Sequence, residues 1–199
     1  MSSGYVEHVF PPEYDVDSRV LILGTIPSPK SREKQFYYMH PQNRFWRLLY
    51  DVFEEPFETE ISVRKDFLKR HHIALWDVLA SCEIAGASDS SIRNAKPNDL
   101  SIVLSASQVR TIFVTGKTAQ RYYLKYCRAQ TGQDCIYLPS PSPVSYTHLD
   151  VYKRQTEILS RLMSYNDSDS IANRASCLTD ILFCVTIKEK TGRLPYVLS

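Results

Sequence analysis

The sequence predicts an α/β fold with a mostly parallel four-stranded sheet that is covered on both faces. Four short apolar runs, at residues 20–23, 73–76, 111–114 and 135–138, have the length of buried strands. Segments with helical spacing of apolar residues stand between them. Because alternating strands and helices use right-handed crossovers, the carboxyl ends of all four strands should lie at one edge of the sheet.

The first half of the chain supplies two of these strands. Residues 1–18 are polar and are predicted to form an arm that leads into the strand at residues 20–23. A polar loop follows, and a helix is predicted to begin near Asn43, because apolar residues then recur at helical spacing. Residues 60–70 are predicted to form a second helix, which precedes the strand at residues 73–76.

The second half repeats the pattern. A polar loop is predicted over residues 83–94, and Pro97 with Asp99 predicts a helix start, since proline and acids favour the first helical turn. The strand at residues 111–114 is followed by a predicted helix over residues 118–130, and the strand at 135–138 ends in a Ser-Pro run. Loops 24–43, 76–91, 115–117 and 140–143 should therefore meet at the edge where α/β folds bind ligands.

Composition narrows the class of protein. The net charge is +2, so the chain is not basic overall, although a local basic face remains possible. Five cysteines without paired C-x-x-C spacing fit reduced thiols. The scattered histidines and cysteines predict neither a metal nor another cofactor. No signal peptide or membrane-spanning run stands out, so we expect a cytoplasmic, monomeric protein with no membrane partner.

The chain changes character after the Ser-Pro run. Residues 145–155 have no clear period and resemble a translated adapter run from assembled shotgun sequence. We therefore expect a domain over residues 1–144 and a chimeric or poorly ordered tail over 145–199. The alternative is a genuine linker and terminal helix, because apolar residues between 158 and 163 do have helical spacing.

Two loops could bind phosphate. The run Gly116-Lys117-Thr118 resembles the end of a P-loop, but the required earlier glycine is replaced by Thr111, which excludes ATPase chemistry of that type. The amino end of the helix that follows this strand could still bind one phosphate. The simpler interpretation is that Lys117 is an exposed residue at the start of that helix. Ser140 and Ser142 lie in a proline-stiffened loop whose hydroxyl and N–H groups suit a DNA backbone, although a rigid turn explains the run equally well.

Aromatic and amide side chains fill the first loop. Phe36, Tyr37 and Tyr38 are consecutive and cannot all face one core, so one ring is available to stack on a nucleobase. The alternative is that one or two of these rings pack into the core and that the remaining ring has no function. Asn43 could hold a base edge or a water molecule, or it could simply cap the helix that it precedes.

Several of these segments together carry a resemblance to a known family. They are Gly24-Thr25-Ile26-Pro27-Ser28, Phe36-Tyr37-Tyr38, His40-Pro41-Gln42-Asn43-Arg44-Phe45-Trp46, Trp76-Asp77-Val78-Leu79-Ala80-Ser81-Cys82, Gly86-Ala87-Ser88-Asp89-Ser90-Ser91-Ile92 and Leu138-Pro139-Ser140-Pro141-Ser142-Pro143. Over about residues 16–144 the chain resembles the uracil-DNA glycosylase superfamily, and within it the hypoxanthine-DNA (deoxyinosine) glycosylases. The resemblance implies a three-layer α/β/α sandwich that acts on double-stranded DNA containing a damaged base.

The resemblance also implies roles for particular residues. Relatives that excise uracil or mismatched thymine carry Asp or Asn where this chain has Ile26, which cannot activate water. In the hypoxanthine branch the catalytic amide corresponds to Asn43, and Asp89 is a second candidate whose other reading is a helix cap. The implied base pocket comprises Gly24, Thr25, Ile26, Pro27, Ser28, Phe36, Tyr37 and Tyr38. Lys117, Ser140 and Ser142 would contact the DNA backbone.

Three functions remain open from the sequence. The first is a monofunctional glycosylase in base excision repair that hydrolyses the N-glycosidic bond of deoxyinosine. The second is a uracil or mismatch glycosylase, which Ile26 disfavours. The third is a catalytically inactive module that binds DNA lesions, which requires Asn43 to be only a helix cap.

Overall fold

The computed structural model describes residues 4–85 and 91–142. Its centre is a parallel sheet with the strand order β3-β2-β6-β7. These strands are β2 (Val20–Gly24), β3 (Ile73–Asp77), β6 (Thr111–Thr115) and β7 (Cys135–Leu138). The four predicted strands are confirmed, three of them one residue longer than predicted. The apolar runs of β2, β3 and β6 are almost completely buried because both faces of the sheet are covered, which is the usual situation of a parallel sheet, whereas the edge strand β7 is mostly half-buried.

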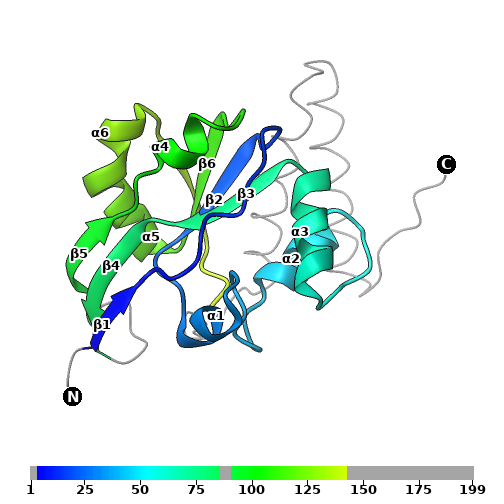
Figure 1. Cartoon of the computed structure of the whole chain (residues 1–199), viewed down its shortest axis with the longest axis horizontal. Coiled ribbons are helices and arrows are strands. Elements are labelled where there is room, and N and C mark those ends of the chain that lie inside the picture. Colours follow the sequence, from blue (N-terminus) through cyan, green and yellow to red (C-terminus); the bar gives the residue numbers. More distant parts are fainter. Residues whose placement is uncertain (1–3, 86–90, 143–199) are drawn as a thin grey trace, which may run out of the picture.

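Helices lie on both sides of this sheet (Figure 1). α2 (Phe45–Val52) and α3 (Ile61–Arg70) lie on one side, and α4 (Ser101–Leu104), α5 (Lys117–Tyr122) and α6 (Arg128–Thr131) lie on the other. The predicted three-layer α/β/α sandwich is therefore confirmed. A π-helical turn, η2 (Tyr123–Cys127), joins α5 to α6, so the helix predicted over residues 118–130 is one helical segment with a π turn inside it.

A second, antiparallel sheet was not predicted. It has the order β1-β4-β5 and consists of β1 (Gly4–Glu7), β4 (Leu79–Ile84) and β5 (Arg93–Pro97). Residues 1–18 are therefore not simply an arm, and strands occupy both ends of the predicted loop at residues 83–94. The sequence did not predict this sheet because β1 and β5 are short and mostly exposed, and they therefore lack an alternation of apolar and polar residues.

Two helix predictions also need correction. The helix predicted to start at Pro97 begins at Ser101 instead, because Pro97 ends β5 and the Asn98 N–H donates to the Val78 carbonyl oxygen at 2.8 Å. The predicted polar loop over residues 24–43 contains the short helix α1 (Pro29–Lys34). Ser28 begins α1 because its hydroxyl accepts the Ser31 N–H at 3.2 Å, with Pro29 in the first turn.

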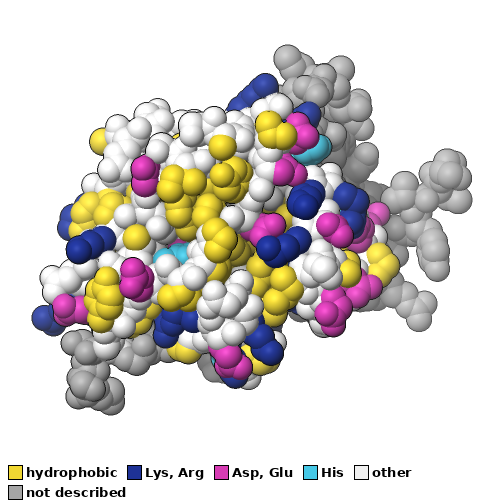
Figure 2. All heavy atoms as spheres, in the orientation of Figure 1, with side chains coloured by type: hydrophobic (Ala, Val, Ile, Leu, Met, Phe, Trp, Pro, Cys, Tyr) yellow, Lys and Arg dark blue, Asp and Glu magenta, His cyan; other side chains and the backbone are white. Residues whose placement is uncertain are grey.

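The outer surface has no dominant charge on the side that Figure 2 shows. Apolar side chains gather near the middle of this face, and acidic and basic side chains are interspersed around them (Figure 2). This mixture agrees with the net charge of +2. Across residues 4–85 and 91–142, no helix has the length and apolar character needed to cross a bilayer.

Candidate functional site

The predicted alignment of the strand ends at one edge of the parallel sheet is confirmed, but the predicted loop over residues 76–91 contains β4, and its residues 86–90 lie outside the described residues. β2 pairs in parallel with both β3 and β6, and β6 pairs in parallel with β7, so Gly24, Asp77, Thr115 and Leu138 end their strands at the same edge. Gly24 is the register partner of Asp77. The side chains of adjacent register partners point to the same face of a sheet, so Asp77 and Thr115 flank the Cα atom of Gly24.

The first loop is held close to this edge by local hydrogen bonds. The Gly24 and Thr25 carbonyl oxygens accept the N–H groups of Val78 and Leu79 at 2.9 and 3.0 Å. Thr25 and Pro27 are buried, whereas Ile26 is partly buried and packs on the core. This predicted pocket segment therefore has a fixed backbone.

The three consecutive aromatic residues separate into two environments. Phe36 stacks on Trp46 with ring centroids 5.5 Å apart, and Tyr37 donates its hydroxyl to the Pro11 carbonyl oxygen at 3.0 Å. Only 1% of Phe36 and 3% of Tyr37 is exposed. The structure thus places these two rings in the core and leaves Tyr38 as the ring of the three that lies over the strand ends.

Tyr38 crosses the edge of the sheet between Gly24 and Thr115. Its backbone turns into the left-handed region, with φ of 55°, which directs the ring away from its two neighbours. The Thr115 hydroxyl donates to the Leu23 carbonyl oxygen at 3.2 Å, so Tyr38 donates to Thr115 at 3.1 Å. One face of the Tyr38 ring stacks on Phe45, with centroids 3.8 Å apart. Burial, together with the Asp77 charge, raises the pKa of Tyr38, so its hydroxyl stays protonated at neutral pH.

Asn43 lies beside the start of α2. Its side-chain oxygen accepts the Phe45 N–H at 2.9 Å, and its own N–H donates to the His40 carbonyl oxygen at 2.8 Å. The helix-capping reading of Asn43 is realised in a modified form: Arg44 is the N-cap residue of α2, and Asn43, one position earlier, satisfies the N–H of the first helical residue. The Asn43 side chain can still form further hydrogen bonds, because its carbonyl oxygen has a second lone pair and its NH₂ group has two hydrogens.

The Ser-Pro loop contacts both the Asn43 segment and the Gly116 turn. The Arg44 N–H donates to the Pro141 carbonyl oxygen at 3.2 Å. Gly116 has φ of 92°, and a side chain there would meet the Ser140 Cβ atom at 3.1 Å. The hydroxyl of Ser140 accepts the Ser142 N–H at 3.3 Å, while Lys117 is exposed at the first position of α5. Lys117, Ser140 and Ser142 thus lie near one another, and their contact with a DNA backbone stays a prediction.

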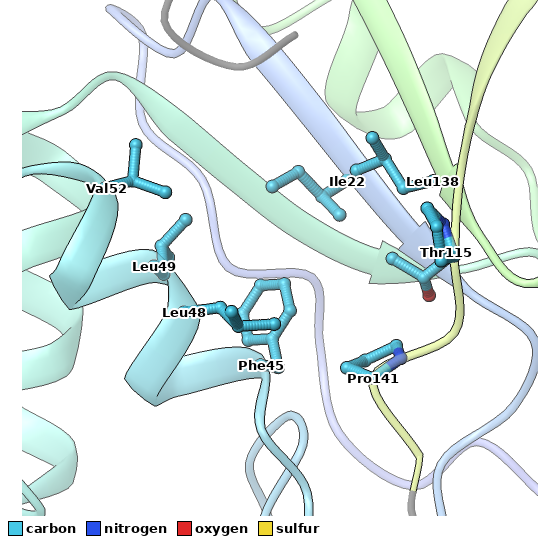
Figure 3. A pocket seen from close by; sticks show the side chains of 9 residues that line it. Ile22, Phe45, Leu48, Leu49, Val52, Thr115, Leu138 and Pro141 are labelled. Atoms are coloured by element: carbon cyan, nitrogen blue, oxygen red, sulfur yellow. The ribbon is translucent and has the colours of Figure 1, made fainter. Parts of the chain in front are cut away.

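An apolar cavity of about 20 Å³ lies behind this loop, between α2 and the sheet (Figure 3). Figure 3 shows Phe45, Leu48, Leu49 and Val52 from α2 facing Ile22, Thr115, Leu138 and Pro141, and Pro139 completes the lining. The cavity offers packing surface and little hydrogen bonding. Asp89, the second catalytic candidate, lies outside the described residues.

Sequence reasoning overlooked one part of this edge. Asp77 is buried, and its Oδ2 atom lies 2.9 Å from His8 Nε2. The side chains of His8 and Asp77 are 3% and 7% exposed. An acid directly after a buried strand could have drawn attention to Asp77. His8 carries no such signal, because it comes from a segment 69 residues earlier.

The fold defines an α/β protein with a parallel sheet, a class in which ligands bind beyond the carboxyl ends of the strands. The sequence model of the uracil DNA glycosylase superfamily matches residues 11–165, and the chain belongs to that superfamily. The match continues past residue 144, whereas the described structure ends at residue 142, so the domain boundary proposed at 144 stays a prediction.

The chain is similar to curated relatives and to solved structures, among them the following three. A hypoxanthine DNA glycosylase of Methanosarcina barkeri is 36% identical over 57% of this chain and 73% of its own length. A hypoxanthine DNA glycosylase of Methanosarcina acetivorans is 34% identical over 59% and 75%. An NMR structure from Methanosarcina acetivorans, provisionally named a uracil DNA glycosylase, has a TM-score of 0.66 and 30% identity, covering 77% of this chain and 94% of that chain.

Replacing Gly24 with alanine should destabilise the protein by about 1–3 kcal/mol, the usual cost of overpacking. The new Cβ atom would lie 2.3 Å from Asp77 Oδ1, and Asp77 is held by His8. Urea unfolding of Gly24→Ala measures the loss. Gly4→Ala is the matched control, because nothing lies within 4 Å of a Cβ atom there. Equal stability of the two variants would contradict the packing described at the strand ends.

Proposed function

We propose that the chain is a monofunctional DNA glycosylase that releases hypoxanthine from deoxyinosine in duplex DNA, in the cytoplasm and as a monomer. The observation that carries the proposal is the similarity to two hypoxanthine DNA glycosylases over about three quarters of their length. Ile26 supports it further, since uracil- and mismatch-type relatives need a polar side chain at that position.

The reaction is hydrolysis. A water oxygen bonds to C1′ of the deoxyribose, the bond between C1′ and the base nitrogen breaks, and the base leaves with the electron pair. Cleavage of such bonds passes through a sugar cation, and negative charge builds on the leaving base. The rate therefore depends on donors directed at the base and on a water molecule held at the sugar.

The residues at the strand ends suit these tasks. The Tyr38 ring stacks on Phe45 and is partly exposed at the strand ends, so it is a candidate to stack on a flipped base. The Asn43 oxygen can accept a water hydrogen while it caps α2, since it has a second lone pair. A neutral amide is a weak base, so we expect leaving-group stabilisation by main-chain N–H groups of residues 24–28 to supply much of the rate. Asp89 remains a second candidate for holding the water.

Asn43→Ser should reduce the single-turnover release of hypoxanthine at least about 100-fold, the scale seen when a positioned catalytic group is removed. Serine retains a helix-capping oxygen, so the stability of α2 should change little. The measurement is base release from a duplex with one deoxyinosine, run beside a deoxyuridine duplex. Gln108→Ala is the control, since it removes an exposed amide before the opposite end of β6.

The same assay separates the competing functions. Full activity of Asn43→Ser would mean that Asn43 is only a helix cap and would refute its catalytic role. Release from the uracil duplex alone would move the chain to the uracil or mismatch type. Tight binding to inosine DNA without release by the unmodified chain would favour an inactive lesion-binding module, the function that the capping bond of Asn43 allows.

Lys117→Ala should weaken binding to duplex DNA and lower the slope of log K against log salt concentration by about 1, because one phosphate contact is lost. The loss should be similar for all sequences. Lys69→Ala is the matched control, since Lys69 is exposed near the end of α3, ahead of the amino end of β3. Fluorescence anisotropy at several salt concentrations measures both slopes. Equal slopes for Lys117→Ala and the unmodified chain would remove Lys117 from the DNA-binding edge.

A further inference from the structure

Arg64 is a buried cation on α3, and only 6% of the residue is exposed. Its Nε atom donates to the Glu58 carbonyl oxygen at 3.0 Å, and its Nη1 atom donates to Met39 Sδ at 3.3 Å. Within residues 4–85 and 91–142 it forms no ion pair with an acid. Burial lowers the pKa of Arg64, but an arginine keeps its charge at neutral pH. The fold therefore keeps a charge in a place where burial is costly.

The guanidinium contacts both ends of the segment that carries Asn43. Its Nη1 atom binds Met39, which comes four positions before Asn43. Its Cζ atom lies over the ring of Trp46, three positions after Asn43, at 4.8 Å from the centroid. A cation over a tryptophan face is attracted by the ring, and more strongly where water is excluded, as at Trp46, which is 2% exposed. One side chain of α3 thus holds residues 39 and 46.

Two further hydrogen bonds hold the ends of this segment. The Met39 N–H donates to the Ser31 hydroxyl oxygen at 3.2 Å, and the Trp46 indole N–H donates to the Tyr37 carbonyl oxygen at 2.9 Å. These bonds join the loop to itself, whereas the guanidinium attaches it to a helix of the surrounding fold. Residues 40–44, between the two ends, are exposed or half-buried, so their position depends strongly on how the ends are held.

We propose that Arg64 is a positioning residue for base release: it fixes Met39 and Trp46 from α3 and thereby holds the Asn43 amide at the strand ends. The inference rests on the function proposed above and on the role given there to Asn43. Because Arg64 is buried, it acts through this segment and touches neither the base nor the DNA backbone. A shift of about 1 Å in a positioned group can cost a factor of about 100 in rate. Loosening the segment should therefore lower the rate of bond cleavage far more than the affinity for DNA.

A role in stability alone fits these contacts less well. Phe67 and Leu68 are 0% and 1% exposed, and they already attach α3 to the core. Replacing a buried charged group by an apolar side chain of similar volume is often neutral or stabilising. A methionine at position 64 would fill much of the same space without a charge. A role in stability and a role in positioning therefore predict different results for Arg64→Met.

Arg64→Met, made in the full chain, should slow the single-turnover release of hypoxanthine from a deoxyinosine duplex at least about tenfold, since the segment loses its attachment to α3. The affinity for a duplex with an abasic site should stay within about twofold, and the melting temperature should change little. Arg64→Lys should recover only part of the rate. Its ammonium group keeps the charge but lacks the planar fork that reaches Glu58 and Met39 together.

Two controls separate positioning from general effects. Arg70→Met is the matched control, since Arg70 lies on the same helix but is half exposed and pairs with Glu55 at 2.6 Å. Its release rate should equal that of the unmodified chain. Val103→Ala opens a cavity in the core on the opposite side of the sheet and controls for lost stability. This variant should melt at a lower temperature and keep its release rate below that temperature.

Two further measurements show whether Arg64 acts through Asn43. In the Asn43→Ser background, adding Arg64→Met should slow release by less than about twofold, because residues that act as a unit are not additive. The Asn43 N–H donates to the His40 carbonyl oxygen, and the Phe45 N–H donates to the Asn43 side chain. Hydrogen exchange of these two amides should be faster in Arg64→Met, whereas exchange in β6 should be unchanged.

Unchanged hypoxanthine release by Arg64→Met overturns the inference. An equal loss in the Asn43→Ser background also overturns it, since Arg64 would then act by another route. A loss of rate that Val103→Ala reproduces at the same melting temperature assigns Arg64 to the fold alone. Unchanged amide exchange at Asn43 and Phe45 refutes the positioning role even if the chain releases no base. An unmodified chain that releases no base refutes the proposed function itself.

Discussion

The parallel register of β2 with β3 and β6 is the constraint on which the site depends. It ends three strands at the same level and so places Gly24, Asp77 and Thr115 side by side, although Gly24 and Thr115 are 91 positions apart in the sequence. The register is fixed by packing, since a slip of one residue would exchange the closely packed side chains of these strands between the two covered faces of the sheet. Hydrophobic packing thus sets the spacing of the polar groups.

Gly24 allows these groups to converge. A larger residue would displace the Asp77 carboxylate and press on the Tyr38 hydroxyl. The first loop then returns over the strand ends, with Phe36 and Tyr37 anchored in the core and Tyr38 rotated out by its left-handed backbone. The Ser-Pro loop completes the edge through the hydrogen bond from Arg44 to Pro141. The result is a rigid backbone around a small number of polar and aromatic side chains, which suits recognition of one flat base.

The parallel sheet was predictable because each of its strands is a nearly continuous apolar run, as at Val20 to Leu23. The antiparallel sheet was not, since β5 carries polar, exposed residues and is held by pairing with β4. Asn43 and Tyr38 could be singled out as types of residue that bind bases. The pairing of His8 with Asp77 could not, because it depends on where β1 lies against β4, and no local pattern specifies that contact.

The most direct measurement is a crystal structure of the full chain bound to a duplex that contains 2′-fluorinated deoxyinosine, whose glycosidic bond resists cleavage. The account predicts a flipped hypoxanthine stacked on Tyr38, with Asn43 near C1′. A base that stays in the helix, or that binds away from the carboxyl ends of β2, β3 and β6, would contradict it.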